Sequence, residues 1–225
     1  MTLCLVTDRR IRPLVEQCSD AVRAGVDMIQ VRERDVDGGP LALLVAELVR
    51  LTRGTATRVV VNDRLDVALA CGADGVHLRG DSIPPESARS IAPPGFLIGR
   101  SVHGEQEAAT AAATVDYLIA GTVFPTSSKP GLTEWLGLEG LARICHTVAV
   151  PVLAIGGITA DRLAGVAAAG AAGIAAIGLF ADANRPLTDV VADARAAWAQ
   201  RCCRTCGDAR PIRSATAAHG YCRPW

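Results

Sequence analysis

Short apolar runs alternate with segments of helical pattern along almost the whole chain. The runs are rich in Val, Ile, Leu and Ala, and each is followed by polar residues and then by a segment of helix length. Because they are continuously apolar and do not alternate with polar residues, they predict strands that are buried on both faces and paired in parallel. The predicted strands are Leu3–Thr7, Met28–Arg32, Arg58–Asn62, Gly75–Leu78, Phe96–Gly99, Tyr117–Gly121, Val152–Ile155 and Gly173–Ile177.

The spacing of these strands predicts how they are connected. Most begin roughly 20 to 30 residues apart, which leaves room for one crossover helix between parallel neighbours. Eight such units predict a (β/α)8 TIM barrel over residues 1–200. The alternative, an open doubly wound sheet, usually has a glycine-rich first turn, whereas the first turn here, at residues 7–10, contains no glycine. The predicted helices include Pro40–Arg53, Arg64–Cys71, Gln106–Thr114, Leu138–His146 and Asp161–Ala169.

The last part of the chain has a different composition. After Gln200 the periodic patterns stop, and residues 201–225 contain five arginines and four of the eight cysteines. Two pairs, Cys203 with Cys206 and His219 with Cys222, resemble the spacing of zinc ligands, but nothing apolar nearby would form a small core around a metal. We therefore predict a short, irregular and disordered tail outside the barrel.

Composition and charge limit the classes of partner. The 23 basic and 23 acidic residues give a formal net charge of zero, which argues against nucleic acid or a membrane surface as the main partner. Residues 163–181 are uncharged, but they are mostly Ala and Gly, which favours a closely packed helix and a buried strand over a membrane span. The N-terminus does not resemble a targeting segment. We expect a cytoplasmic protein with a small-molecule ligand, and the sequence leaves its oligomeric state open.

The ends of the predicted strands point to an anionic ligand, because a (β/α)8 barrel builds its ligand site there. Gly156 and Gly157 end one strand and Gly178 follows the next, and glycines let a backbone approach a phosphate closely. Lys129, in a loop rich in hydroxyl groups, would add a positive charge. A tight turn without a ligand is the alternative for the glycine pair.

Other predicted strands end in polar side chains. Gln30 and Arg32 alternate along a strand, so both point into the barrel, and an arginine there is costly to bury unless it meets an anion. Asn62 and Asp63 either contact the ligand or cap the next helix. Arg34 could instead be solvated, His77 could be a core histidine, and Ser82 and His103 could belong to helix starts. The other candidates are Ser101, Thr122, Thr126, Ser128 and Ile177.

Five segments in this order resemble the thiamine phosphate synthase/TenI superfamily. They are QVRER at 30–34, VNDRLDVALACGADGVHL at 61–78, IGRSVH at 98–103, GTVFPTSSK at 121–129 and AIGGIT at 154–159. The resemblance implies a cytoplasmic (β/α)8 barrel of thiamine biosynthesis. One branch joins a hydroxymethylpyrimidine pyrophosphate to a thiazole phosphate and releases pyrophosphate with Mg²⁺. The TenI branch isomerises a thiazole carboxylate phosphate by proton transfer.

The resemblance also implies roles for particular residues. Contacts to pyrophosphate and pyrimidine fall on Gln30, Arg32, Asn62 and Lys129. Asp63 would be a metal ligand, and the site would be lined by Arg34, Ser101, Thr126 and Ser128. Backbone N–H groups for the thiazole phosphate fall on Gly157, Ile177 and Gly178, beside Gly156.

Two departures separate the chain from the synthase pattern. That pattern has lysine where this chain has Arg34, and its second metal carboxylate aligns with Ser82. The segments at 32–34 and 99–103, together with Ser82, agree with the TenI branch, although its acid–base histidine aligns with Thr122, so that His77 or His103 would have to replace it. We therefore expect a TenI-like thiazole phosphate tautomerase without an assigned cofactor. The alternatives are a thiamine phosphate synthase that uses Mg²⁺ and a non-catalytic thiazole phosphate-binding or regulatory protein.

Overall fold

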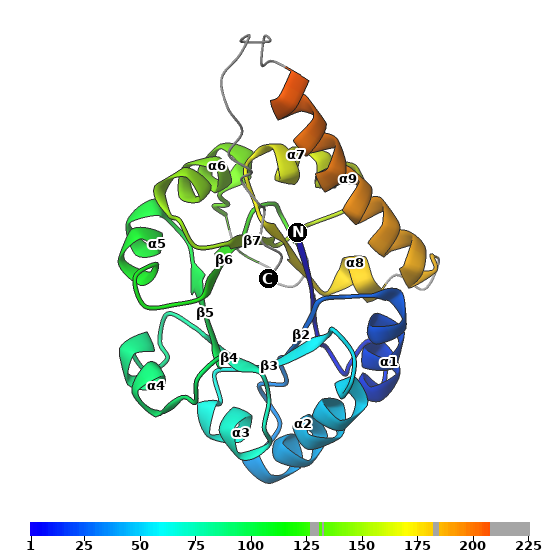
Figure 1. Ribbon diagram of the computed structural model, residues 1–225, viewed down its shortest axis with the longest axis vertical. Coiled ribbons are helices and arrows are strands. Elements are labelled where there is room, and N and C mark those ends of the chain that lie inside the picture. Colours follow the sequence, from blue (N-terminus) through cyan, green and yellow to red (C-terminus); the bar gives the residue numbers. More distant parts are fainter. Residues whose placement is uncertain (127–130, 132, 182–184, 208–225) are drawn as a thin grey trace, which may run out of the picture.

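The protein is a closed barrel of eight parallel strands that follow one another in chain order (Figure 1). This computed structural model describes residues 1–126, 131, 133–181 and 185–207, the last seven of these by their backbone alone. The strands are β1 (Thr2–Val6), β2 (Met28–Val31), β3 (Arg58–Asn62), β4 (Gly75–Leu78), β5 (Leu97–Val102), β6 (Tyr117–Gly121), β7 (Val152–Ile155) and β8 (Gly173–Ala176). The predicted TIM barrel is confirmed.

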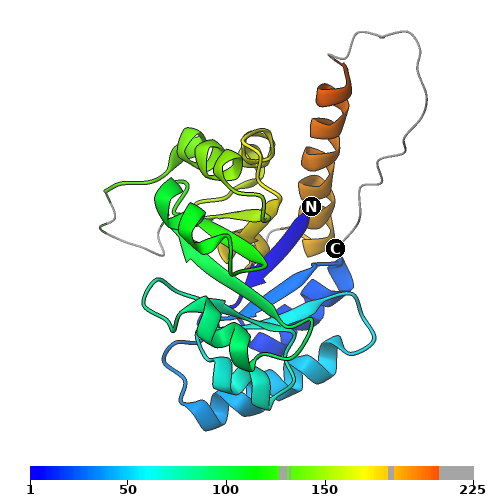
Figure 2. The ribbon, with the colours of Figure 1, turned by 60° about the vertical axis from the view of Figure 1, so that its left-hand side comes forward.

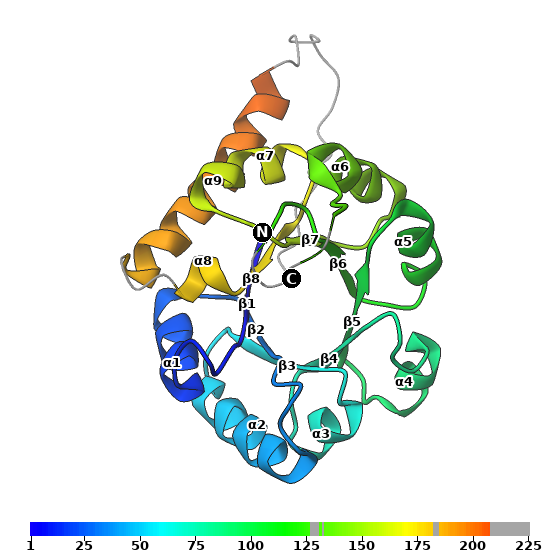
Figure 3. The same ribbon diagram turned by 180° about the vertical axis from the view of Figure 1, so that it is seen from behind.

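Helices surround the barrel, as both views along its axis show (Figures 1 and 3). They are α1 (Leu14–Ala24), α2 (Gly38–Thr52), α3 (Leu65–Ala70), α4 (Pro85–Ile91), α5 (Glu105–Ala111), α6 (Gly137–Thr147), the short 3₁₀ helix η1 (Ala160–Arg162), α7 (Leu163–Ala168), α8 (Gly178–Ala181) and α9 (Leu187–Gly207). The barrel closes where β1 pairs in parallel with β8, from Thr2 opposite Gly173 to Leu5 opposite Ala176.

Several predicted boundaries differ from the structure, and two of the differences affect the site region and the tail. β5 continues beyond Gly99 to Val102, because Ser101 and Val102 still pair with Ile119 and Ala120 of β6. Arg100 and Ser101 therefore belong to a strand and not to the loop after it. At the other end of the chain, α9 crosses the predicted boundary at residue 200 and its backbone stays helical to Gly207, projecting beyond the other helices (Figure 2). The remainder of the predicted tail, residues 208–225, lies outside the described residues.

The uncharged stretch at residues 163–181 folds into α7, β8 and α8 of the barrel wall, as its Ala- and Gly-rich composition predicts. Among the described residues, no helix has the length and apolar character needed to cross a membrane. α9 packs beside α7 and α1. The indole of Trp198 is buried there and donates a hydrogen bond to the carbonyl of Ala171, at 2.9 Å.

The strands divide the apolar residues between two cores. Alternate strand residues such as Leu3, Ile29 and Val59 face the helices. The other set fills the barrel interior and comprises Cys4, Val6, Met28, Val60, Leu97, Tyr117, Ile119, Leu153 and Ala175. At the carboxyl ends of β2, β3 and β4 the buried residues become polar, namely Gln30, Asn62 and His77. The interior is therefore an apolar plug beneath a polar layer.

One close contact inside the barrel depends on a glycine. A Cβ atom at Gly99 of β5 would overlap the ring of Tyr117 on the neighbouring β6. The Tyr117 ring is buried and fills the space that a side chain at position 99 would need. Because position 99 has no side chain, the Tyr117 ring can pack directly against the β5 backbone inside the barrel.

We expect Gly99→Ala to lower the free energy of unfolding by about 1–3 kcal/mol, because the added methyl group overpacks the interior. The matched control is Gly39→Ala in α2, where the new Cβ meets no atom within 4 Å. Ala also has the higher helix propensity, so the control should be as stable as the wild type or slightly more stable. Urea unfolding measures both, and equal stability of Gly99→Ala and wild type would contradict the packing account.

Candidate functional site

Two adjoining pockets open at the carboxyl ends of the strands. The larger, which we call the outer pocket, has a volume of about 1040 Å³ and is lined mainly by the loops after β1, β2, β7 and β8. The smaller, the inner pocket, has a volume of about 120 Å³ and is lined by side chains from β2 to β6 near the barrel axis. Residues that line both are Arg32, Arg34, Thr126, Ile155, Gly156 and Ile177.

Two amides lie in the inner pocket. The Nε2 of Gln30 donates a hydrogen bond to Oδ1 of Asn62, at 3.1 Å, and both side chains are buried. The Oε1 of Gln30 is also buried and has no partner among the described residues. A buried carbonyl oxygen without a donor costs free energy, so this atom marks a position where a ligand N–H group would be stabilised.

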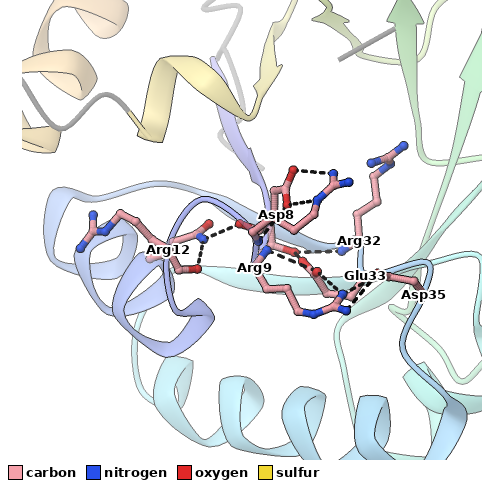
Figure 4. Close-up of polar contacts among 9 residues, drawn as sticks. Asp8, Arg9, Arg12, Arg32, Glu33 and Asp35 are labelled. Carbon is pink, nitrogen blue, oxygen red and sulfur yellow. Dashed lines mark hydrogen bonds and ion pairs between the residues drawn. The ribbon is translucent and has the colours of Figure 1, made fainter. Parts of the chain in front are cut away.

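Arg32 and Arg34 bring two positive charges to the boundary between the pockets. Neither guanidinium forms a hydrogen bond or ion pair with a described residue. Partial burial, and next the neighbouring charge of Arg34, lower the pKa of Arg32 from its ordinary value. Figure 4 shows the Arg32 side chain extending to the side opposite Glu33 and Asp35, the same side as the Asp8 carboxylate, which is paired with Arg10. These two arginines are therefore available to an anion.

The acidic side chains on the same side of the barrel already have partners. Asp8 accepts two hydrogen bonds from the Arg10 guanidinium, at 2.8 and 2.7 Å, and these bonds are the main reason why the pKa of Asp8 is lowered. Asp35 accepts two from Arg9, at 2.5 and 2.9 Å. The carboxylates are neutralised locally, which leaves the positive charge of Arg32 and Arg34 to dominate the pocket boundary.

Asp63 stands at the end of β3 with a left-handed backbone, at a φ of 67°. Its carboxylate accepts a hydrogen bond from the hydroxyl of Ser82, and Nη1 of Arg79 lies 3.4 Å from its other oxygen. Asp81 pairs with the same Arg79 and not with Asp63. Asp81 therefore does not supply the second metal carboxylate that the synthase pattern has at position 82.

This donor set suits Mg²⁺ only in part. Within the described residues there is no group of three or more His, Cys, Asp or Glu side chains that could hold a metal. Asp63 and the Ser82 hydroxyl nevertheless offer two hard oxygen ligands close together. Mg²⁺ usually keeps several waters and binds through one or two carboxylates plus substrate phosphates, so the pair fits an ion that arrives with a phosphorylated substrate.

The histidines are poorly suited to proton transfer. His77 is buried, its Nε2 lies 2.9 Å from the Ser101 hydroxyl, and burial lowers the pKa of His77 to about 3. The imidazole is therefore neutral near pH 7. His103 is exposed and lies 3.4 Å from the carboxylate of Glu107 on α5. Thr122 is buried beside them in the inner pocket and offers a hydroxyl in place of an acid–base group.

The glycine pair after β7 is shaped by the loop after β6. Gly156 and Gly157 have φ angles of 100° and 62°, which favour glycine. A Cβ atom at Gly157 would overlap the Pro125 carbonyl and lie 2.8 Å from Cβ of Phe124. Arg162 packs over the Phe124 ring and donates to the Gly157 carbonyl, at 2.6 Å.

These contacts orient the peptide groups of the loop. The carbonyls of Gly156 and Gly157 accept from the Phe124 N–H and from Arg162. The N–H of Gly157 donates to none of the described residues, and it belongs to the wall of the outer pocket. The tight turn and the ligand contact predicted from the sequence are therefore compatible, because the turn leaves the Gly157 N–H without a described partner at a residue that lines the pocket.

The structure brings together most of the predicted site residues. Gln30, Arg32, Arg34, Asn62, Ser101, Thr122, Thr126, Gly156, Gly157, Ile177 and Gly178 line one or both pockets. Asp63 lies next to Asn62 at the same end of the barrel. Ser128 and Lys129 are outside the described residues. Arg79, which had no predicted role, lines the inner pocket beside Asp63; its position directly after an apolar strand is the signal that could have found it.

A (β/α)8 barrel with two adjoining pockets at the carboxyl ends of its strands, and with Arg32 and Arg34 lining both, defines the class of this protein. The model of the thiamine monophosphate synthase family matches residues 3–180. The chain is 44% identical over 199 residues to a thiamine-phosphate synthase of Methanoregula boonei, covering 87% of this chain and 90% of that protein. It is 42% identical over 163 residues to the enzyme of that name from Pyrococcus furiosus, covering 72% and 78%.

A solved structure gives the same result. Thiamine phosphate pyrophosphorylase from Pyrococcus furiosus superimposes with a TM-score of 0.79 and 38% identity, covering 88% of this chain and 96% of that one. The chain belongs to the thiamine monophosphate synthase family, as the sequence motifs predicted.

The expected TenI-like tautomerase is wrong. Relatives at 44%, 41% and 42% identity are named thiamine-phosphate synthase, which favours the alternative. Three short segments favoured the TenI branch, but in the structure they do not distinguish it from the synthase branch. Arg34 keeps the positive charge of the lysine it replaces, and Ser82 keeps an oxygen against Asp63. A neutral His77 also offers no replacement for the missing acid–base histidine.

The buried His77 should make the stability of the protein depend on pH. Its pKa is about 3 in the folded protein and about 6.5 in an unfolded chain, so between these values the unfolded state binds the extra proton. Stability from this source is complete above pH 6.5 and falls by about 1.4 kcal/mol per pH unit below it. Between pH 6.5 and 4.5, His77→Gln should therefore lose about 2–3 kcal/mol less than wild type in urea unfolding.

The control for this measurement is His146→Gln, which changes an exposed histidine on α6. We expect it to lose stability with falling pH as steeply as the wild type does. If His77→Gln showed the wild-type slope, the assignment of a neutral buried imidazole would be wrong.

Proposed function

We propose that this protein is a thiamine phosphate synthase, which joins hydroxymethylpyrimidine pyrophosphate to a thiazole phosphate and releases pyrophosphate. The observation that carries the proposal is the pair of guanidinium groups, Arg32 and Arg34, without described carboxylate partners where the two pockets adjoin. A reaction between two phosphorylated substrates needs positive charge between them. The synthase names of the relatives support the same reaction.

The inner pocket suits the pyrimidine. The unpaired Oε1 of Gln30 can accept a hydrogen bond from the exocyclic amine of the ring, and Asn62 is fixed beside it. Bound here, the substrate directs its pyrophosphate towards Arg32 and Arg34. The Ser101 hydroxyl, held by the neutral His77, borders the same space.

The outer pocket suits the thiazole phosphate. Its apolar wall, from Ile155, Ile158 and Ile177, can pack against the thiazole ring. The backbone N–H groups of Gly157, Ile177 and Gly178 can donate to the phosphate, because the loops after β7 and β8 are the usual phosphate site of these barrels. By the family pattern, Lys129 would contact the pyrophosphate or pyrimidine and Ser128 would line the site; both lie outside the described residues.

The reaction breaks the bond between the pyrimidine methylene carbon and the pyrophosphate oxygen, and the electron pair leaves with the pyrophosphate. The thiazole nitrogen supplies the pair for the new carbon–nitrogen bond. Arg32 and Arg34 stabilise the negative charge that builds up on the leaving group, and the dry inner pocket strengthens that interaction. When bound at Asp63 and Ser82, Mg²⁺ would supply further charge neutralisation to the pyrophosphate.

The direct test measures pyrophosphate release and thiamine phosphate formation from both substrates, with and without Mg²⁺. We expect product only with Mg²⁺, and a loss of about 100-fold or more in kcat/KM in Asp63→Asn, since the metal loses its carboxylate ligand. The matched control is Asp66→Asn, which changes an exposed aspartate on α3 that pairs with Arg64. Binding of thiazole phosphate without any turnover would instead favour the non-catalytic alternative.

A second prediction concerns the proposed thiazole phosphate site. Gly157→Ala forces a side chain into a left-handed backbone that overlaps the Pro125 carbonyl, so the loop must shift and its N–H groups move. We expect the KM for thiazole phosphate to rise by about ten-fold, with a smaller change in the KM for the pyrimidine substrate.

The control is Gly54→Ala, which also has a positive φ, of 78°, but lies in open space on the far side of the barrel. It isolates the cost of the backbone conformation alone. Unchanged steady-state kinetics in Gly157→Ala would exclude this loop from the phosphate site.

A further inference from the structure

A buried hydrogen-bond chain joins the ends of β1 and β2 directly behind Arg32. The backbone N–H of Arg32 donates to Oγ1 of Thr7, at 3.0 Å. The Thr7 hydroxyl in turn donates to Oε1 of Glu33, at 2.7 Å. Thr7 is fully buried and Glu33 is 7% exposed, so water does not compete for these bonds.

The chain continues outward to Arg9. The second oxygen of Glu33 accepts from the backbone N–H of Arg9, at 3.3 Å, and from its Nη1, at 3.4 Å. Arg9 is held at its other side by Asp35. Figure 4 shows this network on one side of the β2 end and the Arg32 guanidinium extending from the other.

We propose that Thr7 and Glu33 are positioning residues for Arg32. Their hydrogen bonds fix the peptide group from which the Arg32 side chain starts, just beyond the last residue of β2, where the sheet ladder no longer holds the backbone. Because successive residues of an extended chain point to opposite sides, anchoring Glu33 behind the strand sends Arg32 and Arg34 into the pocket. This inference rests on the proposed function, in which Arg32 binds the pyrophosphate group.

The negative charge of Glu33 gives a second reason for this hydrogen-bond network. A free Glu33 carboxylate near Arg32 would pair with it and neutralise the anion site. The Thr7 hydroxyl and Arg9 together occupy both oxygens of Glu33. The hydrogen bonds of Thr7 and Glu33 therefore have two effects. They orient Arg32, and they keep the Glu33 carboxylate from pairing with it.

The test uses inorganic pyrophosphate as the probe, in isothermal titration calorimetry at a fixed Mg²⁺ concentration. Thr7→Val keeps the shape of the side chain but removes both hydrogen bonds, and we expect it to raise the Kd for pyrophosphate by about ten-fold. Thr7→Ser restores the hydroxyl and should bind within about two-fold of wild type. In the kinetic assay, Thr7→Val should raise the KM for the pyrimidine pyrophosphate and leave that for thiazole phosphate near its wild-type value.

A matched control separates positioning from general destabilisation. Thr57→Val removes the hydroxyl of another buried threonine, which is 7% exposed. That hydroxyl donates to the Val26 carbonyl at 2.7 Å, but Thr57 lies before β3 at the opposite end of the barrel. This variant should leave the Kd for pyrophosphate unchanged. In a double-mutant cycle, Thr7→Val should add no further loss once Arg32→Ala is present, because the anchor acts through Arg32.

A second variant covers the case in which Thr7→Val does not fold. Glu33→Asp keeps the negative charge but withdraws the carboxylate by one methylene from Thr7, and it should weaken pyrophosphate binding by about five-fold. Loss of affinity in Thr57→Val equal to that in Thr7→Val, or additive losses in the cycle with Arg32→Ala, would overturn the positioning role.

The outcomes also separate this inference from the proposed function. If the wild type forms thiamine phosphate while Thr7→Val and Glu33→Asp bind pyrophosphate normally, the function stands and the positioning role is wrong. If the wild type forms no product but Thr7→Val weakens pyrophosphate binding and Thr7→Ser does not, the positioning role stands and the function is wrong. A wild type that binds no pyrophosphate would overturn the positioning role, and one that also forms no product would overturn both.

Discussion

The site depends on one unfavourable electrostatic fact, which is that a guanidinium is held in a partly buried pocket without a described carboxylate partner. Removing a charge from water is costly unless an opposite charge compensates it. Among the described residues, the three carboxylates beside Arg32 are paired with other arginines: Asp8 with Arg10, and Glu33 and Asp35 with Arg9. An anion in this pocket would supply the missing opposite charge, which is the physical basis of the proposed binding of a phosphorylated substrate.

The barrel interior provides the rigidity that this arrangement needs. Apolar residues such as Val60 and Ile119 fill its lower part, and the polar layer of Gln30, Asn62 and His77 lies directly above them. Because inward positions alternate along each strand, the same parallel register that packs the plug also sets the height of the polar layer. Substrate specificity and folding therefore share the strand register, and a change in one strand's alignment would disturb both.

Most of the fold followed from the sequence, since continuous apolar runs with one helix between them leave few alternatives to a (β/α)8 barrel. The inward direction of Gln30 and Arg32 also followed from strand alternation. The side-chain hydrogen bonds did not follow from the sequence. Thr7 contacts Glu33, and His77 contacts Ser101, only because the barrel brings neighbouring strand ends together. The left-handed backbone of Asp63 has no signal in the sequence. The identities of residues 34 and 82 favour the wrong reaction branch, because Arg34 still presents a positive charge and Ser82 still presents an oxygen to Asp63.

The contact between Gly99 and Tyr117 has a consequence for how this barrel can evolve. Gly99 of β5 pairs with Tyr117 of β6, and the Tyr117 ring fills the space that a side chain at position 99 would need. A larger residue at position 99 overpacks the interior unless position 117 has first become smaller, so substitutions at the two positions are coupled. The order in which they occur is therefore constrained: a smaller side chain at position 117 must come before a larger one at position 99.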